Sequence, residues 1–139
     1  MILVRRPAHT ERLNLGSSLS ELARARTWLR TVLNDHDVPE PHQARLILTG
    51  SELVANALEH AAPPAWIRVT IEDRVVTLAV CDHSPHVTLP TRRDPDNPRG
   101  RGLHLVQRLA TDWGVRAHER TKTVWCSFDL TAPAPQETR

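Results

Sequence analysis

The chain has 139 residues, of which 40% are hydrophobic and 24% charged, and its formal net charge is +2. These values fit one globular domain and exclude an intrinsically disordered chain. The near-neutral charge does not predict nucleic-acid binding, and no apolar stretch is long enough to span a membrane. We therefore expect one cytoplasmic domain over residues 1–139, with its core at about 20–130.

The N-terminal half predicts a short β-region followed by two helices. Residues 1–15 mix apolar and polar positions in a way that favours one or two strands. Apolar residues at helical spacing then predict an amphipathic helix at 20–33, which ends at the polar run 34–37. A second helix is expected from about Pro41, because proline is tolerated in a first turn, to about Ala61.

Two strand-like runs follow, at 66–71 and 75–80, and the three residues between them form a natural turn. This spacing predicts an antiparallel hairpin. Residues 85–99 contain four prolines and almost no apolar periodicity. Because long loops in compact domains are usually functional or disordered, we expect this segment to be an ordered loop that acts as a lid.

The C-terminal part predicts a third helix and a second hairpin. The helix is expected at about 102–110, and the two strands at 115–119 and 122–130. Residues 131–139 form a polar tail with prolines, which we expect to be frayed. Helices grouped beside a largely antiparallel sheet define a two-layer α+β sandwich, and the element order favours that fold class.

The second helix carries a polar stripe suited to a metal ion and a phosphate. Glu52, Asn56 and His60 are spaced four residues apart, so each step drifts only about 40° around the helix axis. An asparagine oxygen is a hard, neutral ligand for Mg²⁺, and a carboxylate one turn away can orient or deprotonate an attacking hydroxyl. The alternative is that the stripe is only the solvated face of an amphipathic helix.

A second candidate, Asp82, ends the apolar run 75–81. A carboxylate at a strand end can accept a hydrogen bond from the amino group of adenine, whereas the alternative is an Asx turn. Cys81, His83 and His86 beside it are also zinc-ligand types. Successive residues alternate faces in a strand, however, and no second ligand pair has a recognised zinc spacing, so we disfavour a zinc site here.

The third candidate is the stretch Arg99-Gly100-Arg101-Gly102-Leu103, which joins the expected lid to the third helix. Glycines let the backbone approach a ligand closely, and the free N–H groups of a first helical turn form an anion site. We therefore expect phosphates to bind there. The alternative is that the glycine pair is ordinary turn chemistry.

These three stretches, in this order, resemble the nucleotide-binding boxes of the GHKL ATPase superfamily, the Bergerat fold of histidine kinases, gyrase B and MutL. The N box resembles residues 52–60, the first glycine box residues 82–84, and the second glycine box residues 100–103. The resemblance covers about 20–130. It implies about three helices on one face of a mostly antiparallel, mixed sheet, an ATP lid, and ATP and Mg²⁺ as ligands.

Within that superfamily the sequence resembles the anti-sigma-factor serine/threonine kinases of the RsbW and SpoIIAB type, including their actinobacterial relatives. The Glu-x3-Asn-x3-His spacing and the strand residues 121–125 carry this likeness. It implies a kinase that transfers the γ-phosphate of ATP to a STAS-domain antagonist protein, with a sigma factor as a further partner. The alternative is a non-catalytic ATP-binding module that sequesters a sigma factor or another regulator. A homodimer is compatible with either.

The resemblance also implies roles for individual residues. Asn56 would be the Mg²⁺ ligand and Glu52 the catalytic base, while Asp82 would contact adenine with Thr123 beside it. The residues implied to bind the nucleotide are Asn56, His60, Asp82, Ser84, Arg99, Gly100, Arg101, Gly102, Leu103 and Thr123.

Overall fold

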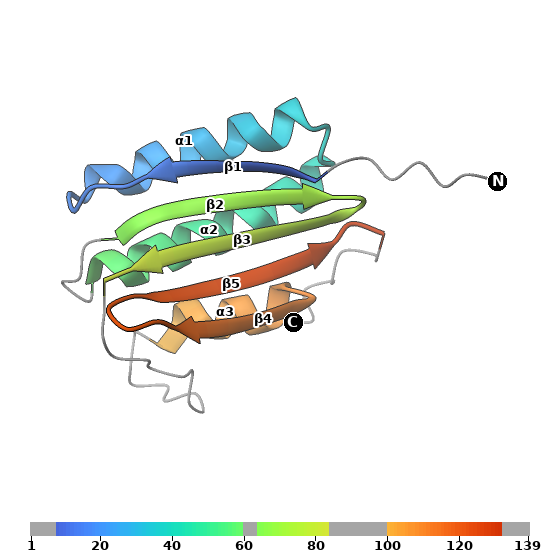
Figure 1. Cartoon of the computed structure of the whole chain (residues 1–139). Coiled ribbons are helices and arrows are strands. Elements are labelled where there is room, and N and C mark those ends of the chain that lie inside the picture. The colour runs from blue at the N-terminus through green and yellow to red at the C-terminus, as the bar shows by residue number, and fades with distance from the viewer. Residues whose placement is uncertain (1–7, 60–63, 84–99, 132–139) are drawn as a thin grey trace.

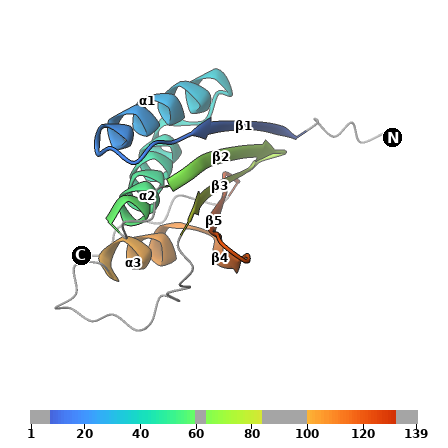
Figure 2. The ribbon, with the colours of Figure 1, turned by 60° about the vertical axis from the view of Figure 1, so that its left-hand side comes forward.

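The computed structural model describes residues 8–59, 64–83 and 100–131 of the chain. Three helices cover one face of a five-stranded antiparallel sheet with strand order β1-β2-β3-β5-β4 (Figure 1). The turned view separates the two layers and shows α2 between α1 and α3 (Figure 2). The elements are β1 (His9–Asn14), α1 (Ser20–Asp35), α2 (Glu40–Glu59), β2 (Pro64–Glu72), β3 (Val75–Asp82), α3 (Gly100–Leu109), β4 (Asp112–Ala117) and β5 (Lys122–Asp129).

The predicted α+β sandwich is confirmed, with small differences at element ends. All four strand pairings are antiparallel, so the sheet is not mixed. The third helix begins at Gly100, which places the whole second glycine box within its first turn. The expected lid at 85–99 and the tail beyond residue 131 lie outside the described residues. No helix in the described part of the chain is long and apolar enough to cross a membrane.

Alternation along the central strands divides the sheet into a covered face and an open face. In β3, Val76, Leu78 and Val80 are buried toward the helices, and they lie opposite Phe128, Cys126 and Val124 of β5. The residues between them point to the other face, because side chains alternate along a strand. The strand register therefore determines which side chains of β3 and β5 face the helices.

The helix layer is held by an apolar interface that α2 shares with α1 and the sheet. Leu29 of α1 is 1% exposed, and Leu46 and Val54 of α2 are completely buried. A β-carbon at Gly50 would lie 2.9 Å from Leu29 Cδ2 and 3.5 Å from Leu78 Cδ1. The missing side chain thus lets α2 sit close to both α1 and β3, which fixes the helix that carries the polar stripe.

The connection from α1 to α2 is tight and well bonded. Asp37 has a φ of 56°, and the N–H of Val38 donates to the carbonyl of Leu33 at 3.1 Å. A left-handed residue after the last turn is a common helix end. The Gln43 amide then donates to Asn34 Oδ1 and to the Val38 carbonyl, both at 2.8 Å. These bonds fix the direction in which α2 leaves the turn.

Candidate functional site

The predicted site residues that the structure describes lie on elements that meet at one end of the sheet. In Figure 1 the C-terminal half of α2, the end of β3, the start of β5 and the start of α3 all lie at the left-hand end. Tertiary contacts join α2 to β3 and to α3. The fold therefore brings the three stretches that were separate in sequence to the same end of the molecule.

A buried ion pair occupies the end of β3. Lys122 Nζ lies 3.7 Å from Asp82 Oδ2, and the two side chains are 7% and 5% exposed. The two residues are direct cross-strand partners, which places both side chains on the covered face. A carboxylate offers about four lone-pair sites, so its pairing with the ammonium is compatible with a further bond from a ligand amino group.

Lys122 is a residue beside the candidate site that the sequence interpretation did not include. Thr123 was expected beside Asp82, but the register pairs Thr123 with Cys81, one step along the strand and on the open face. The expected neighbour is therefore corrected to Lys122. A signal was available, since Lys122 is the only lysine among 18 basic residues and alternates with the apolar residues Val124 and Cys126.

The two described residues of the polar stripe of α2, Glu52 and Asn56, are half-buried rather than fully solvated. Glu52 and Asn56 are intermediate in exposure and lie among the buried residues Ser51, Leu53 and Ala57. Asn56 stands about 140° around the helix from Ser51. Because Ser51 faces α1, Asn56 is turned away from α1.

Two hydrogen bonds hold the α2 backbone just before the stripe. Arg26 Nε of α1 donates to Ser51 Oγ at 2.9 Å, and the same hydroxyl donates to the carbonyl of Ile47 at 2.6 Å. Ser51 is 6% exposed, so this link is largely shielded from water. The bonds tie α1 to α2 one residue before Glu52 and thereby limit its movement.

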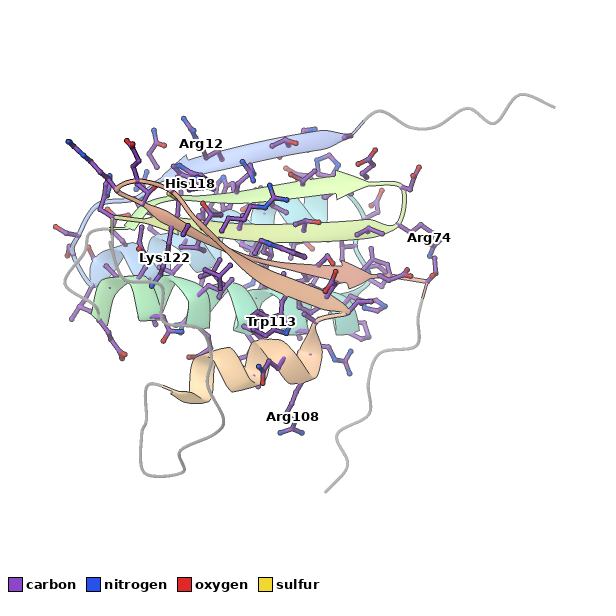
Figure 3. All side chains as sticks on the ribbon, turned by 60° about the horizontal axis from the view of Figure 1, so that its bottom comes forward. Arg12, Arg74, Arg108, Trp113, His118 and Lys122 are labelled. Atoms are coloured by element: carbon purple, nitrogen blue, oxygen red, sulfur yellow. The ribbon has the colours of Figure 1, made fainter. Side chains whose placement is uncertain are left out.

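The helix that follows the glycine pair is anchored at its far end. Val106 is completely buried, and Leu109 packs against the same core as Trp113 of β4. Figure 3 shows Trp113 beside α3 and Arg108 pointing away from the sheet. This anchoring directs the first turn of α3, which starts at Gly100, toward the end of the sheet that holds Asp82 (Figure 1).

Some predicted site residues fall outside what the structure covers. His60, Ser84 and Arg99 lie outside the described residues, and for Arg101 and Leu103 only the helical backbone is described. The zinc alternative gains nothing from the described residues, in which Cys81 and Asp82 point to opposite faces of the sheet.

Of the two buried cysteines, Cys126 is poorly suited to act as a nucleophile. Burial raises the pKa of Cys126 to about 12, while a hydrogen bond with the Leu78 backbone acts in the opposite direction. A thiol nucleophile must ionise, so this residue does not supply one at neutral pH.

Known proteins match this arrangement. The sequence model of the histidine kinase-like ATPase domain matches residues 15–128, which include every element from α1 to β4 and most of β5. The crystal structure of the RsbU and RsbW domains of Rv1364c from Mycobacterium tuberculosis is similar in fold, with a TM-score of 0.70 and 18% sequence identity. The similarity covers 94% of this chain but only 35% of that one. No curated protein matches the sequence.

Proposed function

The chain belongs to the histidine kinase-like ATPase domain family, and from this premise we propose that it binds ATP at the Asp82 end of the sheet. The observation that carries the proposal is the placement of Asp82, the α2 stripe and the first turn of α3 at one end of the molecule. Each group suits a different part of the nucleotide. The shared location of three stretches that are separate in sequence supports one composite site.

Asp82 would recognise the adenine ring of ATP. Its carboxylate accepts the hydrogen bond of an adenine amino group, and the ammonium of Lys122, 3.7 Å away, stabilises the negative charge in its buried position. A nucleobase with a carbonyl in place of that amino group would place an acceptor against the Asp82 carboxylate, which is also an acceptor, and would bind less well. Inosine triphosphate should therefore bind more weakly than ATP, and Asp82→Asn should narrow the difference.

The phosphates and the metal ion would lie between α2 and the first turn of α3. Asn56 is half-buried on α2, and its neutral amide oxygen is a suitable ligand for Mg²⁺. Bound there, Mg²⁺ would neutralise phosphate charge. The N–H groups at the start of α3 suit the phosphate oxygens, and Gly100 and Gly102 let the phosphates approach closely.

The reaction proposed for this site is protein phosphorylation. Glu52 takes the proton of a serine or threonine hydroxyl on a STAS-domain antagonist, the hydroxyl oxygen bonds to the γ-phosphorus, and ADP leaves. A non-catalytic module that sequesters a sigma factor needs Asn56 and Asp82 but no base. Glu52 is therefore the residue that separates the two functions.

A phosphorylation assay tests the proposal. The protein is incubated with labelled ATP, Mg²⁺ and a candidate STAS-domain protein, using wild type, Glu52→Ala and the matched control Glu40→Ala. Glu40 is exposed in the first turn of the same helix, outside the N box, so its loss should leave activity unchanged. We expect Glu52→Ala to lower labelling by about 10²- to 10⁴-fold, the usual contribution of a general base. Equal labelling by wild type and Glu52→Ala would overturn the assignment.

A further inference from the structure

A second cluster of ligand-type side chains lies far from the nucleotide end. His9 and Glu11 are on β1, and His36 follows the last turn of α1. His9 pairs with Ile71 across the sheet, whereas Asp82 pairs with Pro64 at the opposite end of the same β-ribbon. Nothing in the proposed ATP site uses these three residues.

The three side chains converge between the edge strand and the helix. His9 Nε2 lies 2.7 Å from Glu11 Oε2, and His36 Nε2 lies 3.8 Å from the same oxygen. The two imidazole rings have centroids 4.0 Å apart. One ligand atom from each residue lies within 4.8 Å of the others. Two imidazole nitrogens and one carboxylate oxygen thus face a common point.

We propose that His9, Glu11 and His36 form a binding site for a divalent transition-metal ion of the zinc type. Two nitrogens and one oxygen are ligands that Zn²⁺ accepts, and a tetrahedral ion needs ligand atoms about 3.3 Å apart. The separations of 2.7 and 3.8 Å from Glu11 Oε2 lie on either side of that value, and all three ligand atoms lie within 4.8 Å of one another, so side-chain rotation can bring them to one ion.

The backbone under each ligand is already fixed. His9 and Glu11 alternate with one residue between them, so their side chains leave β1 on the same face, toward α1. The N–H of His36 donates to the carbonyl of Val32 at 3.2 Å, and the left-handed residue Asp37 follows. Binding therefore requires no refolding of either element.

The partial exposure of the three side chains leaves room for water on the bound ion, and their positions on two elements predict a gain in stability. The side chains of His9, Glu11 and His36 are 44%, 39% and 29% exposed, which leaves the ion's remaining position to water. Because the ligands come from β1 and from the end of α1, a bound ion joins the edge strand to the helix layer. An ion that binds only the folded chain raises its stability.

Titration calorimetry of the full chain with zinc chloride, without nucleotide, tests the proposal. We expect one ion per chain and an affinity at least tenfold weaker in His36→Ala and Glu11→Gln. The control His118→Ala alters an exposed histidine at the β4–β5 turn and should bind as wild type does. Unchanged affinity in His36→Ala and Glu11→Gln, or several weak ions per chain, would overturn the proposal.

Cobalt(II) gives a second readout that remains valid if a variant is poorly folded. Wild-type protein should give a visible absorption band on adding Co²⁺, and Zn²⁺ should remove that band by displacement. Nitrogen-15 spectra should show ring shifts at His9 and His36 and none at His118. Ring shifts at other histidines alone would show that the ion binds elsewhere and contradict the assignment. Mg²⁺ should not compete, because it prefers oxygen ligands.

Discussion

The covered and open faces of the sheet are formed by the same strands, but charged side chains have different surroundings on each face. On the covered face, Lys122 is 6% exposed and paired with a buried carboxylate. On the open face, the guanidinium of the half-buried Arg68 lies 4.9 Å from the centre of the Trp66 ring. A charge removed from water needs a partner of opposite sign, whereas a charge at the surface needs only a favourable contact. The effect of a substitution should therefore depend on the face more than on the residue type.

The largest effect is expected at Lys122. Lys122→Met leaves the Asp82 carboxylate buried without its ammonium, and breaking such a pair typically costs about 3–5 kcal/mol of unfolding free energy. Urea denaturation measures this loss. The double variant Lys122→Met/Asp82→Leu removes both charges and should recover part of the stability. A loss below about 1 kcal/mol in Lys122→Met would mean that the pair behaves like a surface one.

A smaller effect is expected at Gly114, where packing rather than charge decides. A β-carbon there would lie 2.7 Å from Trp125 Nε1, because the indole ring covers this glycine on the open face. Gly114→Ala must displace the ring, and such overpacking typically costs about 1–3 kcal/mol. Thermal unfolding measures the loss of stability, and tryptophan fluorescence reports the displacement of the ring. An unchanged Tm would contradict the predicted cost of overpacking.

The covered face should also respond to alkaline pH through Cys126. Burial raises the pKa of this thiol to about 12, from 9.0. Between these values the unfolded chain loses the proton and the folded chain keeps it, so stability falls as pH rises. The slope should be up to about 1.4 kcal/mol per pH unit above pH 9. Cys126→Val removes this contribution, so a wild-type slope no steeper than that of the variant from pH 9 to 10.5 would contradict the account.

The smallest effect is expected for the cation–π contact on the open face. Arg68→Ala removes a guanidinium 4.9 Å from the Trp66 ring, a contact worth about 0.5–1 kcal/mol at an accessible site. The matched control is Arg12→Ala, because Arg12 lies over the same ring at 5.9 Å and is exposed. Urea denaturation should rank the losses Arg68 above Arg12, and the reverse order would contradict the geometry.

Much of the fold could be predicted from local patterns. Apolar residues at helical spacing located α1 and α2, and the short turn between residues 71 and 75 correctly predicted the β2–β3 hairpin. The α+β class followed from the element order. The direction of every strand in the sheet could not be predicted in this way. The pairing of β3 with β5 joins segments about 40 residues apart, and it depends on contacts that no local pattern encodes.

Local sequence patterns indicated the candidate residues, but they did not indicate which residue of β5 lies opposite Asp82. Asp82 was identified because a carboxylate ends an apolar run, which is a local signal. The choice between Lys122 and Thr123 depends on which residue lies opposite Asp82, and a one-residue shift exchanges the faces. The cluster of His9, Glu11 and His36 was missed for a similar reason, since it forms only when the end of α1 meets β1.

Calorimetry of nucleotide binding tests the central claim most directly. Wild-type protein is titrated with ATP in Mg²⁺ and again in excess chelator, and both titrations are repeated with Asn56→Ala. We predict one nucleotide per chain, tighter binding with Mg²⁺ in wild type, and little dependence on Mg²⁺ in the variant. A wild-type protein that binds no nucleotide, or an Asn56→Ala protein that keeps the full Mg²⁺ dependence, would contradict the account.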